Sequence, residues 1–282
     1  MKAERITGAV AHHGEGAVWS PLWGGLRWVD MLAGDVLSLD RDGVVERRHV
    51  ATVAAALRPR SAGGAVIGTA TGFLLEAPDG TPEQRYDILR DDRIRMNDGG
   101  CDPDGRFYCG SMHEAAEPGN GTLFRLDTGG VIEPVLADLT ISNGLDWTAS
   151  GDTAYYTDSA TGRIDRFDYE RGTGLTGRRT AARVDARHGL PDGLTVDAEG
   201  GIWVALWGGS AVHRYTPDGR PDHVIEVAAA LVSSCTFGGP RLDELFITTS
   251  RLGLGPDDDP AAGSLFRACP GVAGQPARPY LG

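Results

Sequence analysis

Four acidic or amide side chains open similar short segments of this sequence: Glu15, Asn97, Asn143 and Asp192. Carboxylate and amide oxygens are the ligands that hard divalent cations such as Ca²⁺, Mg²⁺ or Mn²⁺ take in proteins. Taken singly, Asn-Gly and Asp-Gly pairs indicate a turn, although Glu15-Gly16 is not a usual turn pair. The recurrence of all four in one repeat favours a shared metal site, with the exact register of Asn97 less secure because Asp98-Gly99 follows it.

The segments around these residues are copies of one structural unit. Each has an acid or amide, a short strand, a glycine turn and a second, aromatic-rich strand, and a third strand usually begins at a glycine. The anchors at 97, 143 and 192 lie 46 and 49 residues apart (97 to 143 and 143 to 192). A period of roughly 45 residues with three or four short strands is typical of a propeller blade. We count six units, near 15–50, 54–90, 95–137, 141–185, 190–232 and 233–277.

The repeat predicts an all-β fold, a single six-bladed β-propeller domain over residues 1–282. We expect Arg5 to Val10 to add an outer strand to the last blade, because an open ring would expose a sheet edge. Short helical turns are expected at Ala54–Leu57 and Val227–Val232, and the tail from Pro270 should be a closing strand or a loose end. The alternatives are a β-sandwich or a β-helix, and the turn spacing argues against the β-helix. In a propeller the innermost strands line one channel, so the four side chains should converge there.

Composition limits the partners of the protein. The net charge of −12 disfavours nucleic acid. No apolar run approaches the roughly 20 residues that span a bilayer, and the N-terminus has no signal-peptide pattern, so we expect no membrane partner and a cytoplasmic protein. The cysteines lack CxxC spacing and should be reduced, with pairing of the first two across a hairpin as the alternative: Cys101, Cys109, Cys235 and Cys269.

The sequence resembles the senescence-marker-protein-30/gluconolactonase/luciferin-regenerating-enzyme family, which includes regucalcin. The matching stretches are GEGAVW (14–19), RMNDGGCDPDGRFYCGSM (95–112), ISNGLDW (141–147) with YYTDS (155–159), and PDGLTVDAEGGIWVA (191–205). They fall in four of the six expected blades, and the combination is specific although each piece alone is not. The resemblance implies a six-bladed propeller that holds one divalent metal, and sugar-lactone hydrolysis in many members.

The resemblance also implies roles for individual residues. Glu15, Asn143 and Asp192 resemble the three metal ligands, and Asn97 resembles a fourth polar group that contacts metal-bound water or substrate. Arg95 resembles the arginine that binds substrate hydroxyls. One departure concerns specificity: the glutamate of animal members falls on Ala115 here, and the adjacent Glu114 is the candidate to replace it in substrate binding.

These residues predict a metal-dependent hydrolase that opens a sugar lactone to an aldonic acid. The ion, which could be Ca, Mn, Zn or Fe, would polarise the lactone carbonyl and activate a water, and Asp192 would act as the general base. The alternatives are a phosphotriesterase-like hydrolase and a non-catalytic Ca-binding regulatory propeller. The expected partner is a small sugar lactone, and the protein should be a monomer or a small homo-oligomer.

Several aromatic and histidine residues are expected to have structural rather than functional roles. His12 and His13 precede Glu15 and are expected on the surface, although they could lie near the metal. His188 is expected beside the mouth of the channel. Trp207 is expected in a blade core rather than in the wall of the pocket.

Overall fold

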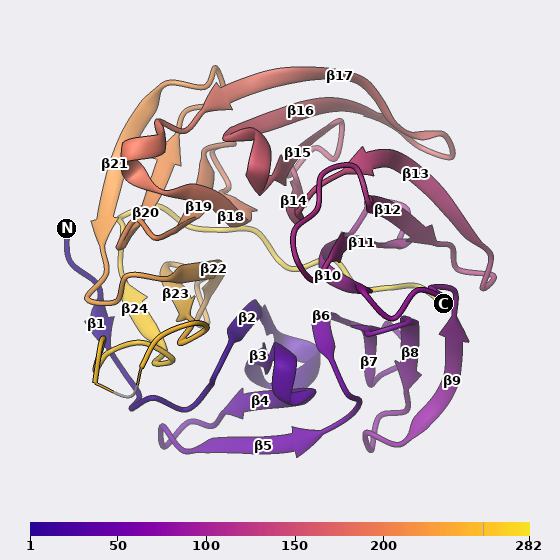
Figure 1. Cartoon of the computed structure of the whole chain (residues 1–282), viewed down its shortest axis with the longest axis horizontal. Coiled ribbons are helices and arrows are strands. Elements are labelled where there is room, and N and C mark those ends of the chain that lie inside the picture. Colours follow the sequence, from indigo (N-terminus) through magenta and orange to yellow (C-terminus); the bar gives the residue numbers. More distant parts are fainter. Residues whose placement is uncertain (256) are drawn as a thin grey trace.

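The computed structural model describes residues 1–255 and 257–282, and it contains six four-stranded antiparallel sheets arranged as the blades of a propeller (Figure 1). Blades 1 to 5 each use four consecutive strands, and blade 6 has the order β1-β24-β23-β22. The strands of blades 1 to 3 are β2 (Gly14–Ser20), β3 (Gly25–Asp30), β4 (Asp35–Leu39), β5 (Val45–His49), β6 (Ala54–Pro59), β7 (Ala65–Thr69), β8 (Gly72–Glu76), β9 (Pro82–Asp87), β10 (Ile94–Cys101), β11 (Phe107–His113), β12 (Gly121–Leu126) and β13 (Ile132–Leu139). The strands of blades 4 to 6 are β14 (Ser142–Trp147), β15 (Thr153–Asp158), β16 (Arg163–Glu170), β17 (Gly174–Arg183), β18 (Leu190–Val196), β19 (Ile202–Trp207), β20 (Ala211–Tyr215), β21 (Pro221–Glu226), β22 (Val232–Gly238), β23 (Glu244–Thr249), β24 (Phe266–Ala268) and β1 (Glu4–Arg5).

The predicted six-bladed fold is therefore confirmed, and the inner strand of each blade begins within one residue of the expected start. The first strand of each blade, β2, β6, β10, β14, β18 or β22, borders the centre of the ring (Figure 1). Large apolar side chains fill the space within and between blades, and Trp28, Trp147 and Trp203 are at most 1% exposed. The repeated packing holds the starts of the inner strands in one ring.

The ring is closed by the N-terminus, as predicted, but the closing strand lies at β1 (Glu4–Arg5) rather than at Arg5–Val10. Glu4 pairs with Arg267 of β24. The ladder then stops because the Thr7 hydroxyl, instead of a backbone carbonyl, accepts a hydrogen bond from the Leu265 N–H at 2.9 Å. The chain stays beside blade 6 as far as Val10, whose N–H donates to Gly263 O.

The expected helical turns are wrong. Ala54–Leu57 lies in the strand β6, where its alanines are completely buried among neighbouring inner strands. Small side chains suit this place because inner strands approach one another closely at the axis. The segment 227–232 forms no helix, and Val232 begins β22.

The C-terminal segment is neither a closing strand nor a loose end. Residues 273–282 run across the ring and bond in turn to blades 6, 5, 4, 3 and 2 (Figure 1). The five contacts are Gly274 N to Leu242 O, Ala198 N to Ala273 O, Arg278 Nη2 to Thr148 O, Leu281 N to Gly105 O and Tyr280 N to Pro59 O. Four of these partners lie where the inner strands end or just beyond, so the segment covers the end of the channel opposite the start of those strands.

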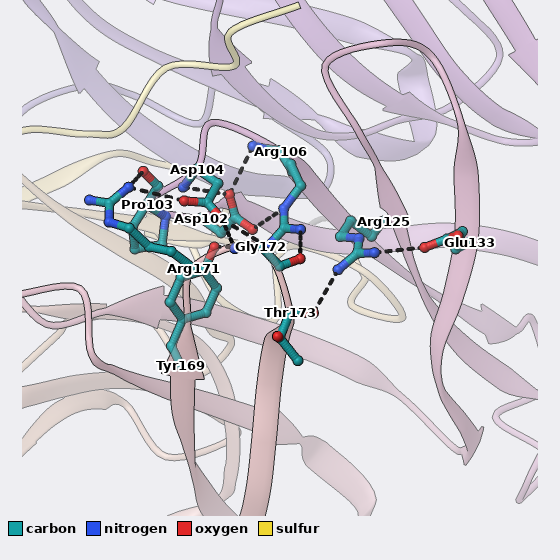
Figure 2. Close-up of polar contacts among 10 residues, drawn as sticks. All are labelled: Asp102, Pro103, Asp104, Arg106, Arg125, Glu133, Tyr169, Arg171, Gly172 and Thr173. Carbon is teal, nitrogen blue, oxygen red and sulfur yellow. Dashed lines mark hydrogen bonds and ion pairs between the residues drawn. The ribbon is translucent and has the colours of Figure 1, made fainter.

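Charged side chains connect neighbouring blades at the end of the channel that the C-terminal segment covers. Arg106, after the turn of blade 3, donates to Asp102 Oδ2 at 2.7 Å and to the Tyr169 hydroxyl and Gly172 O of blade 4 at 2.9 Å (Figure 2). Asp104 accepts from the Gly172 N–H at 2.7 Å. Because Asp102 is completely buried, this network fixes the relative position of blades 3 and 4, which both contribute to the site described below.

Two further features bear on the sequence predictions. All four cysteines are free, and Cys101, Cys109 and Cys235 are buried, so the disulfide alternative is wrong. In the part of the chain that the structure describes, no helix has the length and hydropathy needed to cross a bilayer.

Candidate metal centre

The four acid and amide side chains converge on one cavity at the start of the inner strands. Glu15 lies on β2, Asn97 on β10, Asn143 on β14 and Asp192 on β18. Each is only 4–6% exposed. All four line a cavity of about 200 Å³. Residues that are far apart in the sequence therefore share one small space, as the repeat predicted.

Each of these strands is irregular at the site residue. Its pairing with the second strand of the blade shifts at 15–18, 96–99, 142–145 and 191–194. A break of this kind turns a side chain out of the regular alternation of the strand. It accounts for acidic and amide groups that face the channel axis instead of a neighbouring blade.

Glycines follow three of the site residues because inner strands touch there. A Cβ on Gly144 would lie 2.4 Å from the Leu194 backbone nitrogen, and a Cβ on Gly193 would lie 2.9 Å from Ser233 O. Gly16 has a φ of +57°, which strains any other residue. The Asn-Gly and Asp-Gly pairs are thus not turns, because a close approach of two strands requires these glycines.

The two carboxylates lie in an environment that disfavours their charged forms. Burial, followed by the nearby carboxylates of Asp192 and Asp98, raises the pKa of Glu15 well above its ordinary value. Burial and Asp98 likewise raise the pKa of Asp192. Two buried acids that repel each other need a positive charge or a proton to become stable.

Unpaired oxygens show that the site fits a cation. Among the described residues, the buried Oδ1 atoms of Asn143 and Asp192 have no hydrogen-bond partner. The other end of the Asn143 amide, Nδ2, donates to the Ser159 hydroxyl at 2.9 Å. With Nδ2 on Ser159, Oδ1 is the end that faces no protein partner, so two acids and one amide can offer oxygen atoms to a hard divalent ion.

Over residues 1–255 and 257–282, no three His, Cys, Asp or Glu side chains come together to hold a metal. An ion in this cavity would therefore need the amide oxygen of Asn143 besides the carboxylates of Glu15 and Asp192.

Asn97 makes contacts other than those expected. Its Oδ1 accepts from Arg95 Nη1 at 2.7 Å, and its Nδ2 donates to Ser142 O at 2.9 Å. Both polar ends of the amide thus have protein partners. In this state Asn97 holds the Arg95 guanidinium in place at the cavity wall.

Arg95 and Glu114 form an ion pair at the edge of the cavity. Arg95 is buried and lines the cavity. Its Nε lies 3.3 Å from Glu114 Oε1. The Glu114 side chain is half exposed and is not among the residues that line the cavity. Ala115 has no carboxylate, and its N–H donates to His113 Nδ1. Glu114 therefore acts on the cavity through Arg95.

Further residues complete the cavity, and the sequence reasoning did not place them there. His13 is buried rather than on the surface, and Trp207 lines the cavity instead of a blade core; His188 lies in a separate groove beside His213. Burial, with Arg95 nearby, lowers the pKa of His13 to about 3, which keeps its ring neutral. The remaining members are Met112, Ile141, Ser159, Leu190 and Leu252. A signal for His13 was available, because it precedes Glu15 by two residues as Arg95 precedes Asn97.

The chain matches a known protein family over most of its length. Residues 13–251 match the family described as SMP-30/Gluconolactonase/LRE-like region. The chain belongs to this family. The match includes the inner strands β2, β10, β14 and β18, which carry the side chains of the cavity.

Relatives in the family extend over the whole chain. A pentonolactonase of Haloferax volcanii, XacC, is 33% identical over 98% of this chain and 97% of its own. Regucalcin of Sus scrofa is 32% identical over 100% of this chain and 99% of its own. The crystal structure of a calcium-binding protein, regucalcin, from Agrobacterium tumefaciens has a TM-score of 0.93 and 27% identity, and covers 99% of this chain and 97% of that chain.

Proposed function

We propose that this chain is a metal-dependent lactonase that hydrolyses a sugar lactone to the corresponding aldonic acid. The observation that carries the proposal is the pair of buried, unpaired oxygens on Asn143 and Asp192 beside the Glu15 carboxylate. The name of the Haloferax volcanii relative, a pentonolactonase, supports the reaction class. The name of the Agrobacterium tumefaciens relative, a calcium-binding protein, supports a divalent ion.

Glu15, Asn143 and Asp192 would hold the ion. When bound, it supplies Lewis-acid chemistry at the lactone carbonyl, whose oxygen gains negative charge as water adds. With an ion held between them, Glu15 and Asp192 would need no proton for stability, so Asp192 would be ionised at neutral pH.

Asp192 would take the proton from the attacking water, since its carboxylate lines the cavity that the lactone enters. The water oxygen would bond to the carbonyl carbon, the bond between that carbon and the ring oxygen would break, and the ring oxygen would leave as a hydroxyl after taking the proton back from Asp192. Glu15 stays an ion ligand in this scheme.

Arg95 would orient the substrate. Its contacts with the protein use Nη1 and Nε, and Nη2 is left for a substrate oxygen. Asn97 and Glu114 keep the guanidinium in place from two sides. Their contribution to substrate binding is therefore mainly through Arg95.

A substrate panel tests the proposal. The purified protein would be loaded in turn with Ca²⁺, Mn²⁺, Zn²⁺ or Fe²⁺ and assayed for proton release from glucono-, galactono-, xylono- and arabinonolactone, with paraoxon as a comparison and EDTA as a control. We expect hydrolysis of at least one lactone that EDTA abolishes and the ion restores. Hydrolysis of paraoxon alone would indicate a phosphotriesterase, and ion binding without any hydrolysis would indicate a regulatory propeller; either result would refute the proposal.

A further inference from the structure

The cavity is built from pairs of residues spaced two apart on four inner segments. All eight members of these pairs line the cavity: His13 and Glu15, Arg95 and Asn97, Ile141 and Asn143, Leu190 and Asp192. We call the second members the ion tier and the first members, His13, Arg95, Ile141 and Leu190, the upper tier. Leu190 is 39% exposed whereas Asp192 is 5% exposed, so the upper tier reaches the mouth at Leu190, while His13 and Arg95 are buried.

The upper tier is polar on one side and apolar on the other. His13 and Arg95 come from blades 1 and 3, and Ile141 and Leu190 come from blades 4 and 5. Trp207, which packs against His13, and Leu252 also line the cavity. A molecule that sits above the ion tier thus meets hydrogen-bonding groups at His13 and Arg95 and carbon at Ile141 and Leu190.

The His13 ring has a hydroxyl partner at one of its two nitrogens. Its Nδ1 lies 2.8 Å from the Ser250 hydroxyl. That hydroxyl oxygen accepts from the Leu252 N–H at 3.0 Å, and its own proton can be donated to Nδ1. We assign this arrangement to the pair, which places the ring proton on Nε2. An edge-to-face contact with Trp207, at 5.7 Å between ring centroids, fixes the ring.

We propose that His13 is a substrate-binding residue, whose Nε2–H donates to a hydroxyl oxygen of the lactone, and that the substrate carries its hydroxyls on the edge facing His13 and Arg95. This inference rests on the proposed lactonase function. The opposite edge of the ring, against Ile141 and Leu190, is bare carbon. A hydroxyl placed against these two side chains would lose its water without gaining a partner from them, which selects against lactones that carry one there.

The test compares variants on matched substrates. His13→Phe keeps an aromatic ring but has no donor, and in His13→Gln the amide nitrogen can reach the place of Nε2. With the best lactone of the panel, we expect His13→Phe to lower kcat/KM about tenfold, mainly through KM, and His13→Gln to recover most of the loss. The exposed neighbour gives the matched control His12→Phe, which should behave as the wild type. Bound metal per chain should stay the same in all three.

The monodeoxy analogues of the same lactone identify the hydroxyl. The analogue that lacks the hydroxyl bound by His13 should be a poorer substrate for the wild type. His13→Phe should not lower the kcat/KM for this analogue any further. Ser250→Ala, which removes the partner of Nδ1, should give a smaller loss on the parent lactone and serves as a second variant if His13→Phe folds poorly. Equal losses on the parent and every analogue, or a loss of bound metal, would overturn the role of His13. If the wild type opens no lactone, the proposed function fails, and this inference falls with it.

Discussion

Blades 1, 3, 4 and 5 differ from blades 2 and 6 in what their inner strands present to the channel. Every inner strand has an irregular pairing near its start, including β6 at 54–56 and β22 at 232–234. In blades 2 and 6 the residues at this place are Ala55 and Ser233, both completely buried. All six blades therefore share one backbone feature, and the side chain placed on it separates the four blades that supply an acid or amide to the cavity from the two that do not.

Two serines show the same difference on a smaller scale. Ser159 of blade 4 accepts a hydrogen bond from the Asn143 amide. Ser233 of blade 6 donates to Gly14 O, next to Glu15, and lies 2.9 Å from the Thr248 hydroxyl. One hydroxyl orients a candidate ligand, whereas the other ties two blades together.

Replacing the acid of blade 5 should have the largest effect. Asp192→Asn removes both an ion ligand and the proposed base, so we expect lactone hydrolysis to fall by a factor of about 10²–10⁴ and bound metal to fall as well. Initial rates and metal content per chain are the measurements. Asp218→Asn, which changes an exposed acid of the same blade, is the matched control. Full activity in Asp192→Asn would remove this residue from the reaction.

The acids of blades 1 and 5 should also make ion binding dependent on pH. In the ion-free protein the raised pKa values of Glu15 and Asp192 mean that the folded state holds protons that the unfolded chain has lost. The stability from these protonated groups is complete below the unfolded pKa values of about 4, and it is lost as pH rises through the folded values. A divalent ion replaces the protons, so its stabilising effect grows with pH.

Thermal unfolding with and without added ion, between pH 5 and pH 8, measures this effect. We expect the ion-induced rise in Tm to be larger at the alkaline end. In Glu15→Gln the rise should be smaller throughout. A rise that is independent of pH would contradict the assignment of these two acids as ligands.

Ser159→Ala should weaken the site without removing a ligand. The Asn143 amide would lose the bond that fixes its orientation, and loss of such a supporting contact lowers metal affinity by roughly tenfold or more. Ion titration of the purified variant measures the change. The exposed Ser150 provides the control variant Ser150→Ala. An unchanged affinity would show that Asn143 keeps its orientation without Ser159.

Ser233→Ala should have the smallest effect on the ion. It removes a bond between blades rather than a contact to a ligand side chain, so ion affinity should change by less than about threefold, while the free energy of unfolding falls by about 1 kcal/mol. Denaturant unfolding and ion titration together test the contrast with Ser159→Ala. A larger loss of ion affinity in Ser233→Ala than in Ser159→Ala would reverse the distinction between the two blades.

Much of the fold could be predicted because the blades are repeated in the sequence. The spacing of Asn97, Asn143 and Asp192 predicted the blades and the convergence of their inner strands on the axis. The helical turn expected at Ala54–Leu57 was wrong. The alanines lie in a strand, where small side chains are needed because the inner strands are crowded. The position of the closing strand was wrong because the Thr7 side chain replaces a backbone partner. That the whole chain folds as one domain stays a prediction.

The cavity was only partly predictable. Glu15, Asn143, Asp192 and Arg95 line it, but their roles as ligands and as a substrate-binding group stay predictions. The contact of Asn143 with Ser159 and that of His13 with Ser250 join residues 16 and 237 positions apart. A repeat predicts which strand starts meet at the axis, but not which side chains of the second strands and loops reach them.

The C-terminal segment closes one end of the channel and leaves the other end open. Residues 275–278 lie across the end opposite the ion tier. In the proposed reaction, a lactone and its aldonate product would share the single remaining opening, so accumulated aldonate should inhibit by occupying the entrance that the next lactone needs.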